Sequence, residues 1–479
     1  MIHFSSLCFA SFAFSVPTRN ADLEYSLHGQ DVLNDALQLL HAGEMPRLCY
    51  EDMRKAFRLA PMESSVNGGF HGSAEDKVNM FRERFNLVHQ RVRRHNAFRQ
   101  TISTNSAQLD SASTPGIKIT PIDSLLGEYG NRFLLGMLTQ VEEGCYYLED
   151  LTGKIPINMA NIRCDGFVSE NTIVLVEGAV IDGVFKPEKM GMPPYEVRHE
   201  AIDTVGLQTA DIFSSIGNRS QFQLLKEQEE EAVDRQFVIL SDVHLDVPLV
   251  MDKLKDLFEG FEHHSTLPVF VFMGNFTSRP VSHAKDGVKT VIDCFDALGN
   301  MIADDFPRIA RKAKFIFVPG LTDPGGGTVY PRPPLPTIFT RVLSQKVSHF
   351  NCASNPCRVR FFTQELVFFR DDLVGKLQAS SIADIEGSHD SLSHTAFKTC
   401  LDQGHLSPLP LVNNPIYWNY DHAMRLYPPP DVLVVGDCVE QSVVNYDGCQ
   451  AMNPGSFSKE FGFIVFCPTD KEVSQSAIG

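Results

Sequence analysis

The chain has 479 residues, 43% of them hydrophobic and 21% charged, a composition typical of a soluble globular protein. Its length predicts several domains, because single hydrophobic cores stop growing near about 250–300 residues. The 42 basic residues stand against 59 acidic ones, and the formal net charge of −17 disfavours strong duplex binding by the chain as a whole and favours protein partners.

The cysteines and apolar runs bear on the cellular compartment. The eleven cysteines form no C-x-x-C pair, which favours reduced thiols in a cytosolic or nuclear protein and does not imply zinc. Residues 1–16 are apolar but lack a basic n-region, so we expect a buried or irregular N-terminus and not a signal peptide. No later run reaches the roughly 18 apolar residues of a membrane span.

The N-terminal region predicts helices. Apolar positions recur at helical spacing within residues 30–60, and Gly43 supplies a stop signal. Residues 76–98 predict a basic helix, which is either a solvated face or an anchor for an acidic partner surface or a phosphate backbone. We therefore expect a helical remnant over residues 1–75 and a basic helix with its linker over residues 76–110. The helix carries Arg82, Arg84, Arg91, Arg93 and Arg94.

Residues 111–205 change to short β-rich runs with glycine-containing turns, which predict a five-stranded OB-type barrel. Such barrels often bind single-stranded nucleic acid through stacking aromatic side chains, a role open to Tyr146 and Tyr147. Residues 132–193 contain five basic against nine acidic side chains, however. The charge therefore favours a structural barrel.

A third region, residues 222–479, begins with a polar helix and then alternates strands and helices. This βαβαβ order predicts a parallel sheet covered by helices, with functional residues in the loops that follow the strands. Conspicuous residues fall at these strand ends. They are Asp242, His244, Gly274, Asn275, Gly320 to Asp323 and Asp437.

The strand-end motifs resemble, in their order, those of the calcineurin-like metallophosphoesterases, which run Asp-x-His, Gly-Asp, Gly-Asn-His and Gly-His-x-His. Asp242 and His244 match the first motif, and their spacing puts both on one side of a strand. In that chemistry two metal ions about 3.5–4 Å apart clamp a phosphate and generate the nucleophile. The bridging aspartate of the family corresponds to Asn275, a neutral amide that offsets little of the repulsion between two dications.

The remaining motifs also depart from the metallophosphoesterase pattern. Leu321 replaces a liganding asparagine, and Thr322 replaces the histidine that protonates the leaving group. Asp437 and Val439 stand where two histidines are expected. Few ligands of the metal pair would therefore remain.

We interpret Asp242 and His244 as vestiges of a metal site on a retained scaffold, with no catalytic residue, metal or cofactor. The alternative is an active metal-dependent phosphatase or nuclease that uses the same pair with Asp323 and Asp437 as replacement ligands. The expected fold class is α/β and β, with a short N-terminal helical segment, an OB-type barrel and an inactive calcineurin-like phosphoesterase sandwich.

An OB-type barrel followed by a phosphoesterase fold without its ligands resembles the second, non-catalytic subunits of the eukaryotic replicative DNA polymerases. Long runs in order, from about residue 35 to 470, are similar to the epsilon branch of that family, with the alpha and delta branches as alternatives. The runs include DKVNMFRERFNLVHQRVRRHNAF, LLGMLTQVEEGCYYLEDLTGKI, FVILSDVHLD, VFMGNFTS, PRPPLP, SNPCRVRFFTQELVFFRDDLV, NPIYWNYDHAMRLYPPPD and MNPGSF.

The resemblance implies a nuclear, non-catalytic scaffold subunit that binds the C-terminal domain of the polymerase epsilon catalytic subunit and links it to the replisome. It further implies the small histone-fold subunits as partners, weak or indirect contact with DNA, and no membrane. Family members usually begin with a helical domain that resembles a docking piece for GINS, a component of the replicative helicase. A shorter segment precedes the basic helix here, so GINS and the helicase are implied less directly.

Overall fold

The computed structural model describes residues 37–60 except 52, 72–98, 117–281 except 126, 128, 129 and 215, 286–386, and 391–479. The expectations for residues 1–36 and for the linker at 99–116 lie outside these ranges. No helix in the described part of the chain is long and apolar enough to span a bilayer.

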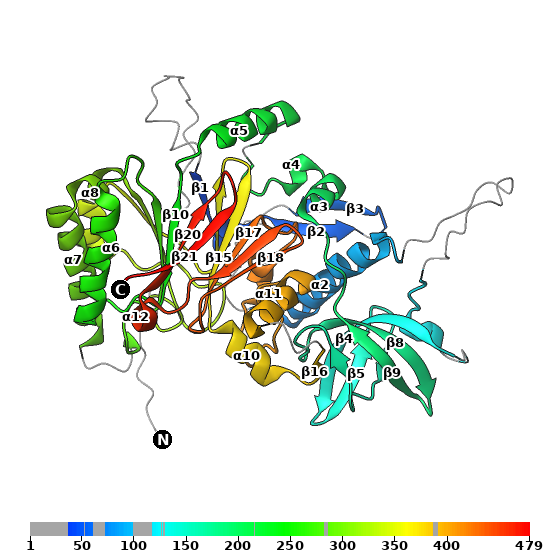
Figure 1. Ribbon diagram of the computed structural model, residues 1–479. Helices are drawn as coiled ribbons and strands as arrows, with labels where there is room; N and C mark the ends of the chain where they lie inside the picture. The colour runs from blue at the N-terminus through cyan, green and yellow to red at the C-terminus, as the bar shows by residue number, and fades with distance from the viewer. Residues whose placement is uncertain are drawn as a thin grey trace.

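Two six-stranded sheets form a sandwich in the second half of the chain (Figure 1). The first sheet has the order β13-β12-β11-β10-β20-β21, in which the first four strands are parallel. Helices α6, α7 and α8 cover its outer face, as the βαβαβ order predicts. The bounds are β10 Phe237–Ser241, α6 Pro248–Glu262, β11 Val269–Met273, α7 Gly287–Asp305, α8 Pro307–Lys312, β12 Lys314–Val318, α9 Arg341–Lys346, β13 His349–Cys352, α12 Phe457–Glu460, β20 Gly462–Cys467 and β21 Glu472–Ala477.

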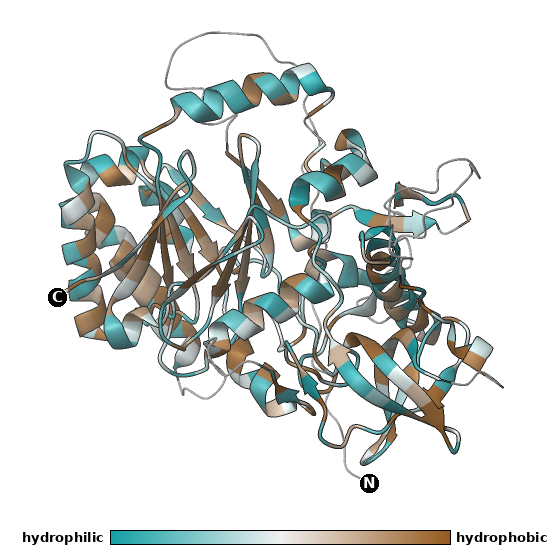
Figure 2. Ribbon diagram, turned by 45° about the vertical axis from the view of Figure 1, so that its right-hand side comes forward, coloured by the Kyte–Doolittle hydropathy of each residue, from teal (hydrophilic) through white to brown (hydrophobic). Residues whose placement is uncertain are grey.

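The second sheet has the order β1-β14-β15-β17-β19-β18, and α10 and α11 pack against its outer face. An apolar core between the two sheets joins residues such as Ile239, Val271 and Val434, all fully buried. Figure 2 shows these inner strands as predominantly hydrophobic. The bounds are β1 Leu37–His41, β14 Cys357–Phe361, β15 Gln364–Arg370, α10 Leu373–Ser380, β16 Asp384–Ile385, α11 Leu392–Gln403, η4 Trp418–Met424, β17 Val432–Gly436, β18 Ser442–Tyr446 and β19 Cys449–Asn453.

The prediction of helices in the N-terminal region is wrong for residues 37–60. Strand β1 pairs antiparallel with β14, and Leu37 and Leu39, two residues apart, both pack against the core between the sheets. The buried side chains of this segment therefore recur every two residues, as in a strand, and not at helical spacing. The reason is that strand β14, about 320 residues later in the sequence, pairs with it. The sandwich thus begins at β1 and not at residue 222. The other elements are η1 Ala42–Glu44, β2 Arg47–Glu51 and β3 Ala56–Ala60.

The predicted OB-type barrel is confirmed. Its five strands are hydrogen-bonded in the order β6-β5-β4-β8-β9, and a bridge between Ile157 and Phe185 draws the two outer strands together. Its core contains Leu134, Leu148 and Val176. The bounds are η2 Ile122–Leu125, β4 Arg132–Glu142, β5 Cys145–Glu149, β6 Lys154–Pro156, β7 Arg163–Cys164, β8 Ile173–Ile181 and β9 Val184–Gly191, followed by α3 Arg198–Val205, α4 Leu207–Ala210 and α5 Arg219–Glu231.

Helix α2 (Ala74–Arg94) lies between the barrel and the sandwich (Figure 1). It begins at a capping box in which the Ser73 hydroxyl accepts from the backbone of Asp76 and the Asp76 carboxylate accepts from that of Ser73. Val88 and Val92 pack against Leu135 of the barrel. The helix therefore buries one face against the barrel and leaves its arginines to meet the sandwich.

Three arginines of α2 make contacts inside the molecule, contrary to both interpretations of the basic helix, whereas Arg82 and Arg93 are exposed. Arg84 donates to the Asp421 carboxylate, Arg91 to the Asp402 carbonyl at the end of α11, and Arg94 to Glu196 at 2.6 Å. Arg84 and Arg91 are 8% and 3% exposed. These two side chains are therefore neither solvated nor available to an external partner.

Candidate functional site

The strand-end residues of the first sheet meet at one edge. Asp242 directly follows β10, and its backbone N–H donates to the Met273 carbonyl at 3.0 Å. The Asn275 side chain, after β11, accepts from the backbone N–H of Thr322, after β12, at 3.1 Å. The predicted gathering of these three positions is thus present.

The Asp242 carboxylate is held by neighbours on all sides. Its Oδ1 lies 3.0 Å from His244 Nε2 and 3.4 Å from Arg370 Nη2, and its Oδ2 accepts from the Ser456 hydroxyl at 2.6 Å. Burial opposes ionisation of Asp242, but the His244 hydrogen bond, the Arg370 charge and the Ser456 hydrogen bond hold its pKa well below the usual range. Side chains of the protein itself therefore stabilise the ionised form of this buried carboxylate.

Arg370, at the end of β15, is the residue that sequence reasoning missed. Its guanidinium is 1% exposed and donates to the carbonyls of Gly274 and Gly436 and to Asp372 at 2.8 Å. Burial disfavours its charged form, but Asp372 and Asp242 outweigh that effect and raise its pKa. The only signal in the sequence is an arginine that ends the apolar run LVFF.

The carboxylate of Asp323, one of the two possible replacement ligands, accepts hydrogen bonds from the backbone. Its two oxygens accept from the N–H groups of Phe276 at 2.8 Å and Gly320 at 2.7 Å. Burial raises the pKa of Asp323 to about 6, although these hydrogen bonds oppose the shift. Both carboxylate oxygens are therefore turned toward the loops and hold them together.

Asp437 is used in a similar way. Its Oδ2 accepts from the N–H of Val374 at 2.8 Å and its Oδ1 from that of Val439 at 3.3 Å. Its ligand atom lies within 4.8 Å of those of Asp372 and Cys438, a group separate from the pair of Asp242 and His244. Leu321, the replacement of a liganding asparagine, packs against the core of the second sheet.

These donors do not fit a pair of dications. A metal at Asp242 would lie beside the Arg370 guanidinium, whose positive charge repels it across a few ångströms. The amide of Asn275 supplies no bridging charge. The geometry therefore supports no step that runs through a bound metal.

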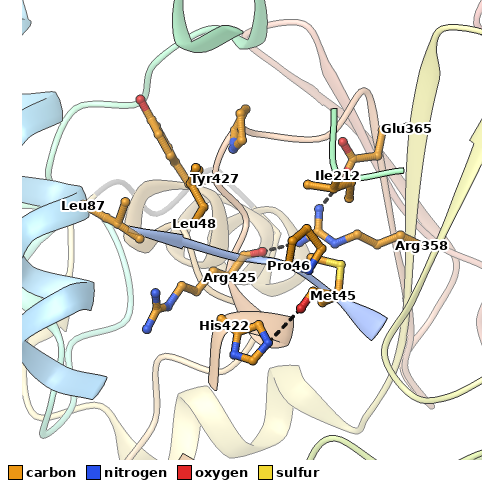
Figure 3. Close-up of a pocket in the computed structure, with 11 residues that line it drawn as sticks. Met45, Pro46, Leu48, Leu87, Ile212, Arg358, Glu365, His422, Arg425 and Tyr427 are labelled. Carbon is orange, nitrogen blue, oxygen red and sulfur yellow. Dashed lines mark hydrogen bonds and ion pairs between the residues drawn. The ribbon is translucent and has the colours of Figure 1, made fainter. Parts of the chain in front are cut away.

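A separate pocket, away from the strand ends, lies where the N-terminal turn, α2 and the sandwich meet (Figure 3). Arg358 pairs with Glu365 across it, and His422 Nε2 lies 3.0 Å from the Met45 carbonyl. Burial lowers the pKa of His422 to about 4, so this histidine is neutral at pH 7. Much of the polar lining is thus used in internal contacts, although Arg358 Nε and Arg425 Nη1 are buried without a hydrogen-bond partner.

The two barrel tyrosines make contacts within the barrel. Tyr146 packs against the barrel core, and the Lys154 ammonium lies 5.4 Å from the centre of the Tyr147 ring. Both side chains are only partly exposed. Together with the acidic excess, this arrangement favours the structural interpretation of the barrel.

Comparison with known proteins gives two matching family models. The model that describes the B subunit of DNA polymerases alpha and epsilon matches residues 237–444. The model described as DNA polymerase epsilon subunit 2-like, OB-fold domain, matches residues 74–194. The two matches cover most of the sandwich and the barrel with α2, and β1, β19, β20 and β21 lie outside them.

Individual relatives match over most of the chain. The DNA polymerase epsilon B subunit of Arabidopsis thaliana is 37% identical over 92% of this chain and 83% of its own length. DNA polymerase epsilon subunit 2 of Homo sapiens is 36% identical over 95% of this chain and 86% of its own length. A solved archaeal phosphodiesterase covers 51% of this chain and 99% of its own at 13% identity and a TM-score of 0.27, too low to bear on activity. Through its relatives and both matched domains, the chain belongs to the family of DNA polymerase epsilon second subunits.

Proposed function

We propose that this chain is a non-catalytic scaffold subunit of nuclear DNA polymerase epsilon that binds the C-terminal domain of the catalytic subunit. Its family membership supports the complex, and the small histone-fold subunits are further partners that the family resemblance suggests. The ion pair between Arg370 and Asp242 is the observation that supports a non-catalytic role, because the Arg370 guanidinium supplies the positive charge that a metal ion would otherwise supply.

The acidic surface suits an assembly role. A chain of net charge −17 with no built ligand site among its described residues gains most from a protein partner, which stabilises the folded state by mass action. Helix α2 fixes the barrel against the sandwich, so the two domains present a single continuous surface. Such a surface suits a large, partly apolar interface.

Coexpression with the C-terminal half of the epsilon catalytic subunit should yield a stoichiometric complex that survives size-exclusion chromatography in moderate salt. The chain alone should aggregate more readily, because its partner surface is uncovered. Matched coexpressions with the alpha and delta catalytic subunits serve as controls. Capture of either of these in preference to epsilon would contradict the proposed partner while leaving the scaffold role intact.

The purified complex should hydrolyse neither a phosphodiester model substrate nor DNA through this subunit when Mn²⁺, Mg²⁺ or Zn²⁺ is added. The reason is that Asn275, Leu321 and Thr322 remove the bridge, a ligand and the acid. The measurement uses a catalytic subunit inactivated in its own nuclease site. Turnover that is lost on Asp242→Ala but kept on Asp256→Ala would show an active phosphoesterase.

A further inference from the structure

A basic hairpin projects from an otherwise acidic molecule. Among the described strands, β2 and β3 pair only with each other, and the turn between them, residues 53–55, is exposed. Met53 at this turn is 97% exposed, the highest value among the large hydrophobic side chains of the described residues. Figure 1 shows the hairpin at the rim of the molecule, beside α3 and α4.

The base of the hairpin is firmly anchored. The Phe57 ring centroid lies 5.1 Å from that of Tyr50 and 5.5 Å from that of Tyr427, and Leu48 packs on Leu87 of α2. Arg47 donates to Glu83 of α2 at 3.2 Å. The exposed turn therefore has a fixed direction relative to the sandwich and is not a loose loop.

The charge of the hairpin is opposite to that of the whole chain. Residues 47–60 contain four basic residues (Arg47, Arg54, Lys55 and Arg58) and two acidic ones (Glu51 and Asp52), a net charge of +2. The remaining residues then carry −17 − 2 = −19. The Arg54 side chain is 79% exposed and that of Arg58 is 52% exposed, although both contact Glu51. Lys55, next to Arg54 in the turn, is exposed as well.

We propose that this hairpin contacts the backbone of duplex DNA held by the polymerase complex. Arg54 and Lys55 would neutralise phosphates of a duplex, whose two strands together carry about one negative charge per 1.7 Å of helix axis. Met53, unbranched and apolar, fits against sugar edges in a groove, as apolar side chains do in minor-groove proteins. The inference rests on the proposed function, because the acidic chain alone gathers too little positive charge to hold DNA.

The test compares two glutamine variants within the assembled complex. R54Q/K55Q removes the exposed positive charges of the turn. Lys55 has a left-handed backbone conformation, with φ of 50°, and glutamine places a side chain at this position just as lysine does. K186Q/K189Q is the control, since it removes two exposed lysines from β9 of the barrel. Both complexes must first coelute with the catalytic subunit. Failure of the wild type and the control as well would count against the proposed function, whereas failure of R54Q/K55Q alone would assign the hairpin to the protein interface and overturn the DNA proposal.

Affinity for a duplex with a primer end is then measured by fluorescence anisotropy from about 50 to 200 mM salt. For R54Q/K55Q the slope of log K against log salt should become shallower by about 2, roughly 0.9 for each lost phosphate contact. The control should keep the original slope. M53S should weaken binding several-fold at an unchanged slope.

Three results would overturn the proposal. One is an unchanged slope for R54Q/K55Q. Another is an equal change for K186Q/K189Q, which would assign the contact to general charge or to the barrel. In the third, the R54Q/K55Q complex loses binding to a polyglutamate peptide but still binds the duplex normally. The hairpin would then be a site for an acidic protein.

Discussion

Asp421→Ala is expected to lower the free energy of unfolding by about 3–5 kcal/mol, the cost of removing one partner from a buried charge cluster. Asp421 is 1% exposed and accepts from Arg84 Nε at 2.9 Å and Arg425 Nε at 3.0 Å. Its third neighbour, His405, lies at 3.2 Å, and burial lowers the pKa of that histidine to about 4. Without the carboxylate, the buried Arg84 guanidinium loses its anionic partner, and Arg425 keeps only Glu83.

Urea denaturation measures this loss, and two variants calibrate it. Asp256→Ala removes the exposed partner of Lys253 and should change the unfolding free energy little. Asp421→Asn keeps the shape but not the charge, so its loss should be intermediate. An equal, small effect for Asp421→Ala and Asp256→Ala would mean that α2 does not depend on this cluster for its attachment.

Arg370→Leu is expected to cost a similar amount, about 3–5 kcal/mol at pH 7, because it leaves the buried Asp242 carboxylate without the Arg370 charge and removes one of the donors to each of the Gly274 and Gly436 carbonyls. The pH dependence has a definite sign. The folded pKa of Asp242 lies below its unfolded value of about 3.9, so its contribution to stability is present above that value and is lost as the pH falls further.

In the Arg370→Leu variant the pKa of Asp242 should rise, since burial then acts with less opposition. During acidification the folded variant therefore binds a proton at Asp242 at a higher pH than the folded wild type does. The difference in unfolding free energy between the variant and the wild type should then shrink as the pH falls toward about 4. Arg370→Leu with Asp242→Asn should recover part of the loss. A difference that stays constant with pH would show that Arg370 acts through packing alone.

The sandwich strands were predictable because their signals are local. The apolar runs within residues 237–241, 269–273 and 314–318 are followed by an aspartate, a glycine and a proline, and all three form parallel strands. The alternation of strand and helix then places Asp242 and Asn275 at one sheet edge without further information. The OB-type barrel followed from short β-rich runs and glycine turns in the same way.

The failures share a physical cause, which is dependence on distant residues. Leu33, Leu37 and Leu40 have helical spacing in the sequence, but pairing with β14 makes residues 37–41 a strand. The basic character of α2 gave no hint that Asp421 and Glu196 would meet Arg84 and Arg94. A pattern within one segment does not report which charges lie opposite it in the folded chain.

The pairing of β1 with β14 has a consequence for synthesis. The hydrogen bond from the Ala42 N–H to the Ser354 hydroxyl, beside that pair, spans 312 residues. At a translation rate of about 5–20 residues per second, the ribosome needs on the order of 15–60 s between the two segments. Throughout that interval the leucine-rich first strand has no partner, whereas the barrel between them is already complete. An unpaired apolar strand is a template for wrong pairing, so this segment is exposed to such pairing until the ribosome has delivered the strand that closes the sheet.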